Sequence, residues 1–435
     1  DKPAKDLDSL SLAVQHARAR MGEVANVLKA ATFKPGAPAY TTLIKVCGRM
    51  GQWEKAWEVF ECMTAQGVDP NTITYSALIN ACGKSKQWEK AMEVFALMKE
   101  KGVEANIFTY SALISACAKG RQWDAAVAVF EEMEAAGVEA DAITYSAMIS
   151  ACEKGKQWEK ALELFHQMRE AGVEANTITF NSLLGACERG GQWQKGFELL
   201  QVMRETHVPA DRITYATLMA ACDKAREADR ALQLLEEMKA DGVDADAATY
   251  TSLIGACAKG GRWERGIQLF DTVTAPKDKS GGGKARAVEA SLGMYLACLQ
   301  CCEKGAQAKR ALAVLGAAHK HQRELNLNIY AAALGACEKA QQWEPMLDIY
   351  DNMSLKAGAS PDLNICLMVL AAANKAGRWE KALAVLRKHG AGQGLPVYNF
   401  TLELCSKSGQ WPQVLELYKE MGEGGVALDS AAYHR

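Results

Sequence analysis

The chain has 435 residues, of which 49% are hydrophobic and 23% charged, and its formal net charge is −2 at pH 7. No apolar run approaches the ~18 residues that cross a bilayer, so we expect no membrane partner. The near-neutral average argues mildly against a nucleic-acid partner, although a groove can carry a different charge from the surface around it. The sequence begins at Asp1 without an apolar leader, and we interpret it as a mature fragment.

Residues 1–36 differ from the rest of the chain, and their two apolar-periodic segments predict a helical pair that caps the array that follows. From Ala37 onward a unit of 35 residues recurs, as TYSALINACGKSKQWEKAMEVFALMKEKGVEAN (74–106) and TYSALISACAKGRQWDAAVAVFEEMEAAGVEAD (109–141) illustrate. A fixed period of this length indicates stacked structural repeats rather than separate cores. The repeats begin at Ala37, Thr72, Ile107, Ala142, Thr177, Arg212, Ala247, Leu292, Leu327, Leu363 and Leu395.

Each repeat predicts two helices, which we name helix A and helix B. In the second repeat, helix A is expected over residues 74–83 and helix B over residues 87–100. Apolar residues recur at helical spacing from Tyr75 in helix A and from Trp88 in helix B, so each helix has one apolar face. Gly102 follows helix B, where a left-handed C-cap is needed.

A cysteine recurs at one position of helix A, and a tryptophan opens helix B in nine repeats. Free cysteines are usually buried, and aromatic residues on an apolar stripe pack between repeats more often than they serve as base-stacking platforms. Cys298 and Cys301 form one CxxC pair without a second, so we predict no metal and no cofactor. Unpaired thiols in this number indicate a reducing compartment.

Repeat 7 (247–291) carries a basic, glycine-rich insertion, TAPKDKSGGGKARAVEA (274–290). Its SGGGK is not a phosphate-binding loop, because Lys284 precedes Ala285 rather than Ser or Thr and the glycine spacing is wrong. We therefore predict a flexible surface loop. The insertion separates repeats 1–6 (37–246) from the divergent repeats 8–11 (292–429), and residues 430–435 match the start of a further repeat.

The unit resembles the pentatricopeptide repeat, through the pattern TYSALI…C.K….EKA.E.F..M…GV..N/D, which covers residues 37–429. The tetratricopeptide repeat has 34 residues, a different signature and peptide ligands. The resemblance implies an all-α, right-handed superhelical solenoid of about eleven stacked helix-turn-helix repeats, with helix A lining a concave groove. It also implies sequence-specific binding of single-stranded RNA, one base per repeat, in mitochondrial or plastid RNA processing, stability or translation. No enzymatic activity is expected of the chain itself.

A basic residue stands at position 13 of every repeat, near the end of helix A. Such a residue favours the helix dipole, but a regularly spaced basic row is also typical of a nucleic-acid backbone site, and we expect phosphate contacts. Acidic residues of helix B, such as Glu89, Glu93, Glu159 and Glu163, should face outward and leave the groove basic. The row consists of Arg49, Lys84, Lys119, Lys154, Arg189, Lys224, Lys259, Lys304, Lys339, Lys375 and Lys407.

Position 2 is apolar in five consecutive repeats. Such a residue can be a hydrophobic staple at the start of a helix. The resemblance implies instead that neighbouring position-2 residues clamp a base, and positions 2 and 13 lie about 20° apart on a helix and so share a face. Because the other repeats depart from this pattern, we expect repeats 1–6 to supply most base selectivity. The clamp residues are Ile73, Phe108, Ile143, Ile178 and Ile213.

Nine of the eleven repeats end in Asn or Asp, which also favour turns and helix N-caps. The resemblance implies that this residue and residue 5 together read one base. An amide suits adenine and a carboxylate accepts the imino N–H of guanine or uracil, while Ser or Thr at position 5 accompanies a purine and Asn a pyrimidine. The pairs Thr41–Asn71, Ser76–Asn106, Ser111–Asp141, Ser146–Asn176 and Asn181–Asp211 then predict 5′-AAGAU-3′. Ala216–Asp246 predicts a weak guanine, Asn399–Asp429 predicts uracil, and Thr251 has no clear partner in the sequence.

Two other functions stay open at this point. A solenoid can bind a protein partner, through its outer face or through the divergent C-terminal repeats, although this does not predict the alternation of Asn and Asp. The array can also be the RNA-binding part of a larger RNA-processing enzyme, although the sequence carries neither an HxE…CxxC deaminase signature nor clustered carboxylates.

Overall fold

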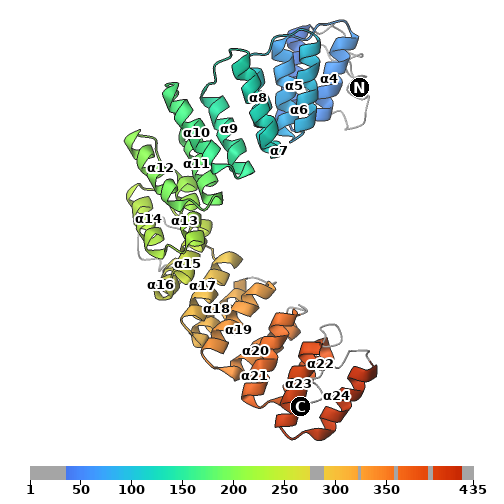
Figure 1. The fold of residues 1–435 in the computed structure, drawn as a ribbon, viewed down its shortest axis with the longest axis vertical. Coiled ribbons are helices and arrows are strands. Elements are labelled where there is room, and N and C mark those ends of the chain that lie inside the picture. Colours follow the sequence, from blue (N-terminus) through green and yellow to red (C-terminus); the bar gives the residue numbers. More distant parts are fainter. Residues whose placement is uncertain (1–35, 275–288, 322–324, 357–360, 390–394, 424–435) are drawn as a thin grey trace. The chain divides into compact units, whose positions relative to one another are not determined.

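The computed structural model describes residues 36–274, 289–321, 325–356, 361–389 and 395–423. These residues form 22 α-helices and no strand (Figure 1). None of the described helices is long and apolar enough to span a membrane. Most of the insertion at 274–290, the cap expected over 1–36 and the start of a further repeat at 430–435 lie outside the described residues.

The chain divides into two compact units after Ala221, and helices A and B alternate along both. Odd-numbered helices are helix A of a repeat and even-numbered ones are helix B. The first unit contains α3 (Ala37–Arg49), α4 (Trp53–Ala65), α5 (Thr72–Lys84), α6 (Trp88–Glu100), α7 (Ile107–Gly120), α8 (Trp123–Ala135), α9 (Ala142–Gly155), α10 (Trp158–Glu170), α11 (Thr177–Arg189) and α12 (Trp193–Glu205).

Helix α13 (Arg212–Ala225) contains the point of division. The second unit continues with α14 (Ala228–Ala240), α15 (Ala247–Lys259), α16 (Trp263–Thr274), α17 (Leu292–Lys304), α18 (Ala308–His321), α19 (Leu327–Lys339), α20 (Trp343–Lys356), α21 (Leu363–Ala376), α22 (Trp379–His389), α23 (Leu395–Lys407) and α24 (Trp411–Glu423).

The ends of the helices follow from their capping residues. Helix α5 begins at Thr72, two residues before the predicted start, because Asn71 caps it: Asn71 Oδ1 accepts a hydrogen bond from Thr74 N at 3.0 Å. Helix α6 ends at Glu100, as predicted, and Gly102 follows with φ 68°, the left-handed conformation that suits glycine.

Packing between neighbouring repeats builds the array within each unit. From α3 to α11 and from α15 to α23, helix A lies against helix A of the next repeat, as α5 does against α7 and α17 against α19. Helix B adds aromatic contacts across the same boundary, such as Phe95 of α6 against Tyr110 of α7, whose ring centroids are 5.7 Å apart. This chain of contacts between successive repeats is that of a helical-repeat solenoid.

The recurring cysteine is a packing residue, as predicted, and so is the recurring tryptophan in eight of its nine repeats, the exception being Trp411, which is 59% exposed. Cys82 and Cys117 are buried and free of disulfides. Trp88 packs against Gly120 of the next repeat so closely that a Cβ at Gly120 would lie 2.6 Å from Trp88 Cδ1. The tryptophan therefore holds adjacent repeats together.

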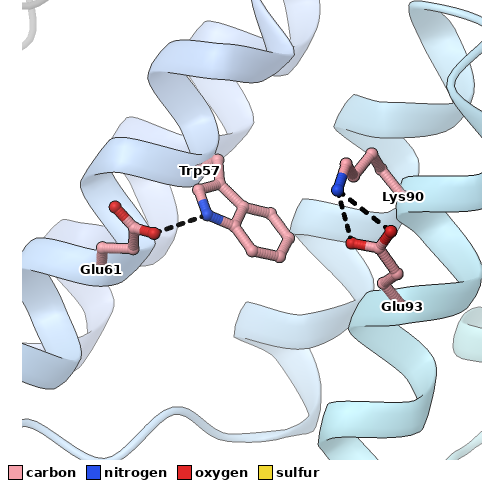
Figure 2. Close-up of polar contacts among 4 residues, drawn as sticks. All are labelled: Trp57, Glu61, Lys90 and Glu93. Atoms are coloured by element: carbon pink, nitrogen blue, oxygen red, sulfur yellow. Dashed lines mark hydrogen bonds and ion pairs between the residues drawn. The ribbon is translucent and has the colours of Figure 1, made fainter. Parts of the chain in front are cut away.

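The helix B acids expected to face outward, Glu89, Glu93, Glu159 and Glu163, are exposed, and two of them pair with a lysine on the same helix. Figure 2 shows such a pair on α6, Lys90 with Glu93, next to Trp57 and Glu61 of α4. Trp57 Nε1 donates to Glu61 at 2.8 Å, and Lys90 Nζ lies 5.9 Å from the Trp57 ring centroid and 2.7 Å from Glu93 Oε2. Glu163 forms the same kind of pair with Lys160. Much of the negative charge expected on the outer helices is thus locally compensated.

Candidate nucleic-acid interface

A groove of about 690 Å³ lies over α3, α5 and α7 in the first unit. It contains every kind of residue that the sequence predicts for the second base: two position-2 residues, a position-5 residue, a last residue and two position-13 cations. These residues are Ile73, Phe108, Ser76, Asn106, Arg49 and Lys84.

The position-2 residues are exposed rather than packed. Ile73, Phe108, Ile143, Ile178 and Ile213 are between 56% and 69% accessible to solvent. A hydrophobic staple would bury such a side chain against the helix. Five large apolar side chains left in water at the same place in successive repeats form a surface suited to an apolar ligand face.

The last residue of a repeat is the N-cap of the next helix A, and this fixes the orientation of its side chain. Asn106 Oδ1 accepts from both Thr109 N and Thr109 Oγ1, each at 3.1 Å. The oxygen end of the amide is therefore committed to the helix, and the atom left for a ligand is Nδ2. Asp141 caps α9 in the same way, with Oδ1 2.8 Å from Thr144 N and from Thr144 Oγ1, which leaves Oδ2.

A buried threonine joins the last residue of a repeat to residue 5 of that repeat. Thr109 is fully buried, and its Oγ1 lies 2.8 Å from Ser76 Oγ as well as 3.1 Å from Asn106 Oδ1. We call this chain of residue 5, threonine and last residue a relay. The sequence prediction missed the threonine, although Thr recurs at position 3 of repeats 2–7.

Five successive repeat boundaries in the first unit carry a relay, and they are the five for which the sequence predicts a complete base-reading pair. The relays are Thr41–Thr74–Asn71, Ser76–Thr109–Asn106, Ser111–Thr144–Asp141, Ser146–Thr179–Asn176 and Asn181–Thr214–Asp211.

The fifth relay contains an additional bond, since Asn181 Nδ2 donates to Asp211 Oδ1 at 3.1 Å. Burial would raise the pKa of the Asp211 carboxyl, but hydrogen bonds from Thr214 N, Asn181 and the Thr214 hydroxyl outweigh it and hold this pKa below its usual range. Asp211 is therefore a carboxylate at neutral pH and can only accept hydrogen bonds.

Relays become sparse beyond the fifth one. Asp246 caps α15 through Thr249, but residue 5 of that repeat is Ala216, which has no hydroxyl. Thr251, which has no clear partner in the sequence, lies with its Oγ1 3.4 Å from Ser291 Oγ, and Ser291 caps α17. Ser291 is thus the residue that replaces Asn or Asp after the insertion.

In repeats 8–10, positions 3 and 5 are apolar. These residues are Met294, Leu296, Ile329, Ala331, Ile365 and Leu367. Asn399 lies on α23, and Asp429 lies outside the described residues.

All eleven basic residues of position 13 lie in the last turn of a helix A. The expectation that the position-13 side of helix A is uniformly basic is wrong, because helix A carries acidic residues as well. Glu153 of α9 is paired with Arg189 at 3.0 Å, because the two side chains extend from the ends of neighbouring helices A. Other members of the row are paired as well, so the row is not uniformly basic.

Within the described part of the chain, no group of three or more His, Cys, Asp or Glu residues is arranged to hold a metal ion. Cys298, Cys301 and Cys302 are all buried in the core of the second unit.

Helical hairpins that repeat every 35 residues and stack helix A on helix A define an α-solenoid repeat protein. Three family models match this chain: the pentacotripeptide-repeat region of PRORP at residues 109–276, the PPR repeat family at 35–84 and 70–119, and the PPR repeat at 397–426. Together they cover more than half of the sequence. The chain belongs to the pentatricopeptide repeat family.

Solved structures share this fold at low sequence identity. The crystal structure of the pentatricopeptide repeat protein PPR10 from maize is 22% identical, with a TM-score of 0.51, over 98% of this chain and 70% of that chain. PPR10 in complex with an 18-nt psaJ RNA element is 20% identical, with a TM-score of 0.47, over 98% and 72%.

The PPR domain of Arabidopsis thaliana protein-only RNase P 1, in complex with tRNA, is 17% identical with a TM-score of 0.37, over 41% of this chain and 94% of that one. A comparison with curated proteins found no match.

Proposed function

We propose that this protein binds single-stranded RNA sequence-specifically, one base per repeat, and that its N-terminal repeats select a core near 5′-AAGAU-3′. One observation carries the proposal: the groove over α3, α5 and α7 joins the exposed apolar pair Ile73 and Phe108 to Ser76, Asn106 and nearby cations. Apolar walls suit the faces of a base, polar caps suit its edge and cations suit its phosphates.

One polar side-chain atom of the last residue caps the helix, so only its other polar atom can select a base. Since Asn106 Oδ1 is committed to Thr109, Nδ2 remains as a donor, which suits the unprotonated N1 of adenine. Since Asp141 Oδ1 is committed to Thr144, Oδ2 remains as an acceptor, which suits the N1–H of guanine. The carboxylate of Asp211 suits the N3–H of uracil for the same reason.

The relays also indicate where base selection ends along the array. Residue 5 has no hydroxyl or amide in repeat 6 and in the described repeats 8–10. We assign most selectivity to repeats 1–5 and only a weak preference for guanine to repeat 6. Apolar residues at positions 3 and 5 would leave the edge of a base there without hydrogen-bond partners.

Family membership supports RNA as the ligand, and PPR10, which shares the fold, is itself solved with an RNA element. The proposed activity is binding, and we assign no chemical step to the chain. On the same family grounds we propose a place in a mitochondrion or plastid, in RNA processing, stability or translation.

The proposal is tested by fluorescence anisotropy with the full chain at fixed salt. One RNA contains the AAGAU core, and fifteen others change one base of it at a time. We expect each change in the core to weaken binding several-fold, because an unmatched polar group in a desolvated site costs about 1–3 kcal/mol. Equal affinity for all these RNAs would refute base reading, and no RNA binding at all would favour the protein-scaffold alternative.

A further inference from the structure

The cations at the end of helix A differ in their surroundings from repeat to repeat. In three later repeats the position-13 cation is bound to an acid at position 12 of the preceding repeat. Arg189 lies 3.0 Å from Glu153. The other two pairs, both 2.7 Å long, are Lys259–Asp223 and Lys339–Glu303.

Each of these acidic side chains packs against a glycine of the next repeat, and the missing Cβ of that glycine leaves the space that the acid occupies. A Cβ at Gly185 would lie 3.0 Å from Glu153 Cδ. Gly255 stands in the same relation to Asp223, with a distance of 2.7 Å to Oδ1, and Gly335 to Glu303, with 3.1 Å to Cδ. The acid, the glycine and the cation therefore form one arrangement that recurs in both units of the chain. In it, the acid of one repeat neutralises the cation of the next.

The first repeats lack this arrangement. Position 12 is Gly48, Gly83 and Ala118 in repeats 1–3, so the preceding repeat offers no position-12 carboxylate to the cations of repeats 2–4. The charge of Glu153, next to Lys154 on the same helix, acts on Lys154, but the ion pair of Glu153 is with Arg189. Among the described residues, Lys84, Lys119 and Lys154 form no ion pair across the repeat boundary. Partial burial lowers the pKa of Lys119, and the charge of Lys84 adds to this effect, so the row repels itself in the free protein.

A second row of cations accompanies the first in the same repeats. Position 15 follows helix A and takes a left-handed conformation, with φ 60° at Lys86, 59° at Arg121 and 58° at Lys156. Residues with a Cβ disfavour this conformation, and five other repeats use glycine there, including Gly51 and Gly191, while repeats 6, 8 and 9 have Arg226, Ala306 and Gln341.

The three position-15 side chains are exposed, and no ion pair within the described residues holds them in place. Glycine would adopt this left-handed backbone conformation without the steric cost of a Cβ. Arg121 is close enough to Lys154 for the two charges to repel. Nothing in the packing of the free protein accounts for a cation at these positions.

We propose that repeats 2–4 carry a phosphate track for the sugar–phosphate backbone of the bound strand, while repeats 5, 7 and 9 neutralise the equivalent cation with an acid of the preceding repeat. The phosphate track consists of Lys84, Lys86, Lys119, Arg121, Lys154 and Lys156. It supplies two cations per repeat that form no ion pair within the described residues, and so two per nucleotide if each repeat reads one base, as the proposed function holds. Positive charge without an acid partner, spaced at the period of the ligand, is what a polyanion site requires.

The test removes three track cations without harm to the fold. Lys86→Gly, Arg121→Gly and Lys156→Gly are combined in the full chain, because glycine suits the left-handed conformation and should keep or raise the melting temperature. The matched control combines Arg189→Gln, Lys259→Gln and Lys339→Gln, which changes the net charge by the same amount but removes cations that are already paired. Both are measured with AAGAU-containing RNA and with an abasic phosphodiester strand of equal length, over a series of salt concentrations.

On both probes, the glycine variant should lower the slope of log K against log salt by about 2, at roughly 0.7 per single-strand charge, and weaken binding about 100-fold near ~0.1 M salt. The control should change the slope much less. Conversely, Glu153→Gln should free Arg189 and raise the slope by about 0.7.

Equal slope changes in the glycine and control variants, or an unchanged slope in the glycine variant, would overturn the track. If the wild type binds RNA and abasic strand equally well, base reading is refuted while the slopes still decide the track. If the wild type binds neither probe, both proposals fail.

Discussion

Replacement of Asn106 by Asp should change the second base that the protein prefers from adenine to guanine. The fold should tolerate the change, because the atom that caps α7 is Oδ1, which both side chains possess. Asp141 makes the same two capping bonds at 2.8 Å, against 3.1 Å for Asn106. A negative charge at a helix N-terminus adds about 0.3–1 kcal/mol of stability, so the melting temperature should hold or rise.

The size of the effect on binding follows from the single atom exchanged. Nδ2, a donor, becomes Oδ2, an acceptor, so adenine N1 meets an acceptor and guanine N1–H gains one. One polar pair lost or gained in a desolvated site is worth about 1–3 kcal/mol, or about 5- to 150-fold in affinity. Ser76 still leaves room for a purine. The preferred core should therefore change from AAGAU to AGGAU.

The assay is competitive binding of four RNAs that differ only at the second base, at fixed salt. The added negative charge weakens all four RNAs alike, so the ranking is the measurement rather than the absolute affinity. Asp141→Asn is the reciprocal control and should move the third base from guanine to adenine. If Asn106→Asp still ranks adenine first, or if all four RNAs weaken equally without a change of order, Asn and Asp serve only as caps.

Three further changes test other parts of the interface. Phe108→Ala should weaken RNA binding by about 1–3 kcal/mol through lost stacking yet leave the melting temperature unchanged, since this side chain is 68% exposed. Leu113→Ala, at a buried position, should instead cost about 2–5 kcal/mol of stability. The reverse pattern would rule out a clamp. Thr109→Val should reduce discrimination at the second base several-fold, whereas Thr249→Val, which has no relay partner at Ala216, should change base preference far less in the same competition assay. Because the pKa of Asp211 is lowered in the folded state, its stabilising hydrogen bonds contribute fully above the unfolded pKa of about 3.9 and are lost as pH falls through the folded pKa. Asp211→Asn should therefore make the free energy of unfolding depend less on pH in the acid range, which urea unfolding at a series of pH values can determine.

The helices were predictable from the sequence because each depends on residues close to it in the chain. The apolar spacing from Tyr75 and from Trp88 identified both helices of the second repeat, and Gly102 marked the end of helix B. The predicted start of helix A was two residues late, because the apolar pattern begins inside the helix while the cap at Asn71 determines where it starts. Membership of the pentatricopeptide repeat family was equally plain, since the period and the pattern recur along the chain.

Contacts between repeats were harder to predict. Glu153 and Arg189 are 36 residues apart, and nothing in the periodicity of either helix shows that their side chains meet. Thr109 was overlooked for a related reason. It belongs to one repeat, while the two base-reading residues that it joins, Ser76 and Asn106, belong to the repeat before. Single-repeat reasoning finds what each helix needs for its own packing, but it misses side chains that act on a neighbour.

The relay through Thr109 determines where this array would have to be cut if a repeat were transferred between proteins. Ser76 and Asn106 stand in one repeat, yet the hydroxyl that connects them comes from the next. A cassette cut between Asn106 and Ile107 would carry a base preference without the residue that orients it. A cassette from Ser76 to Thr109 would keep the three together, so the transplantable module of this protein is offset from its structural repeat by a few residues.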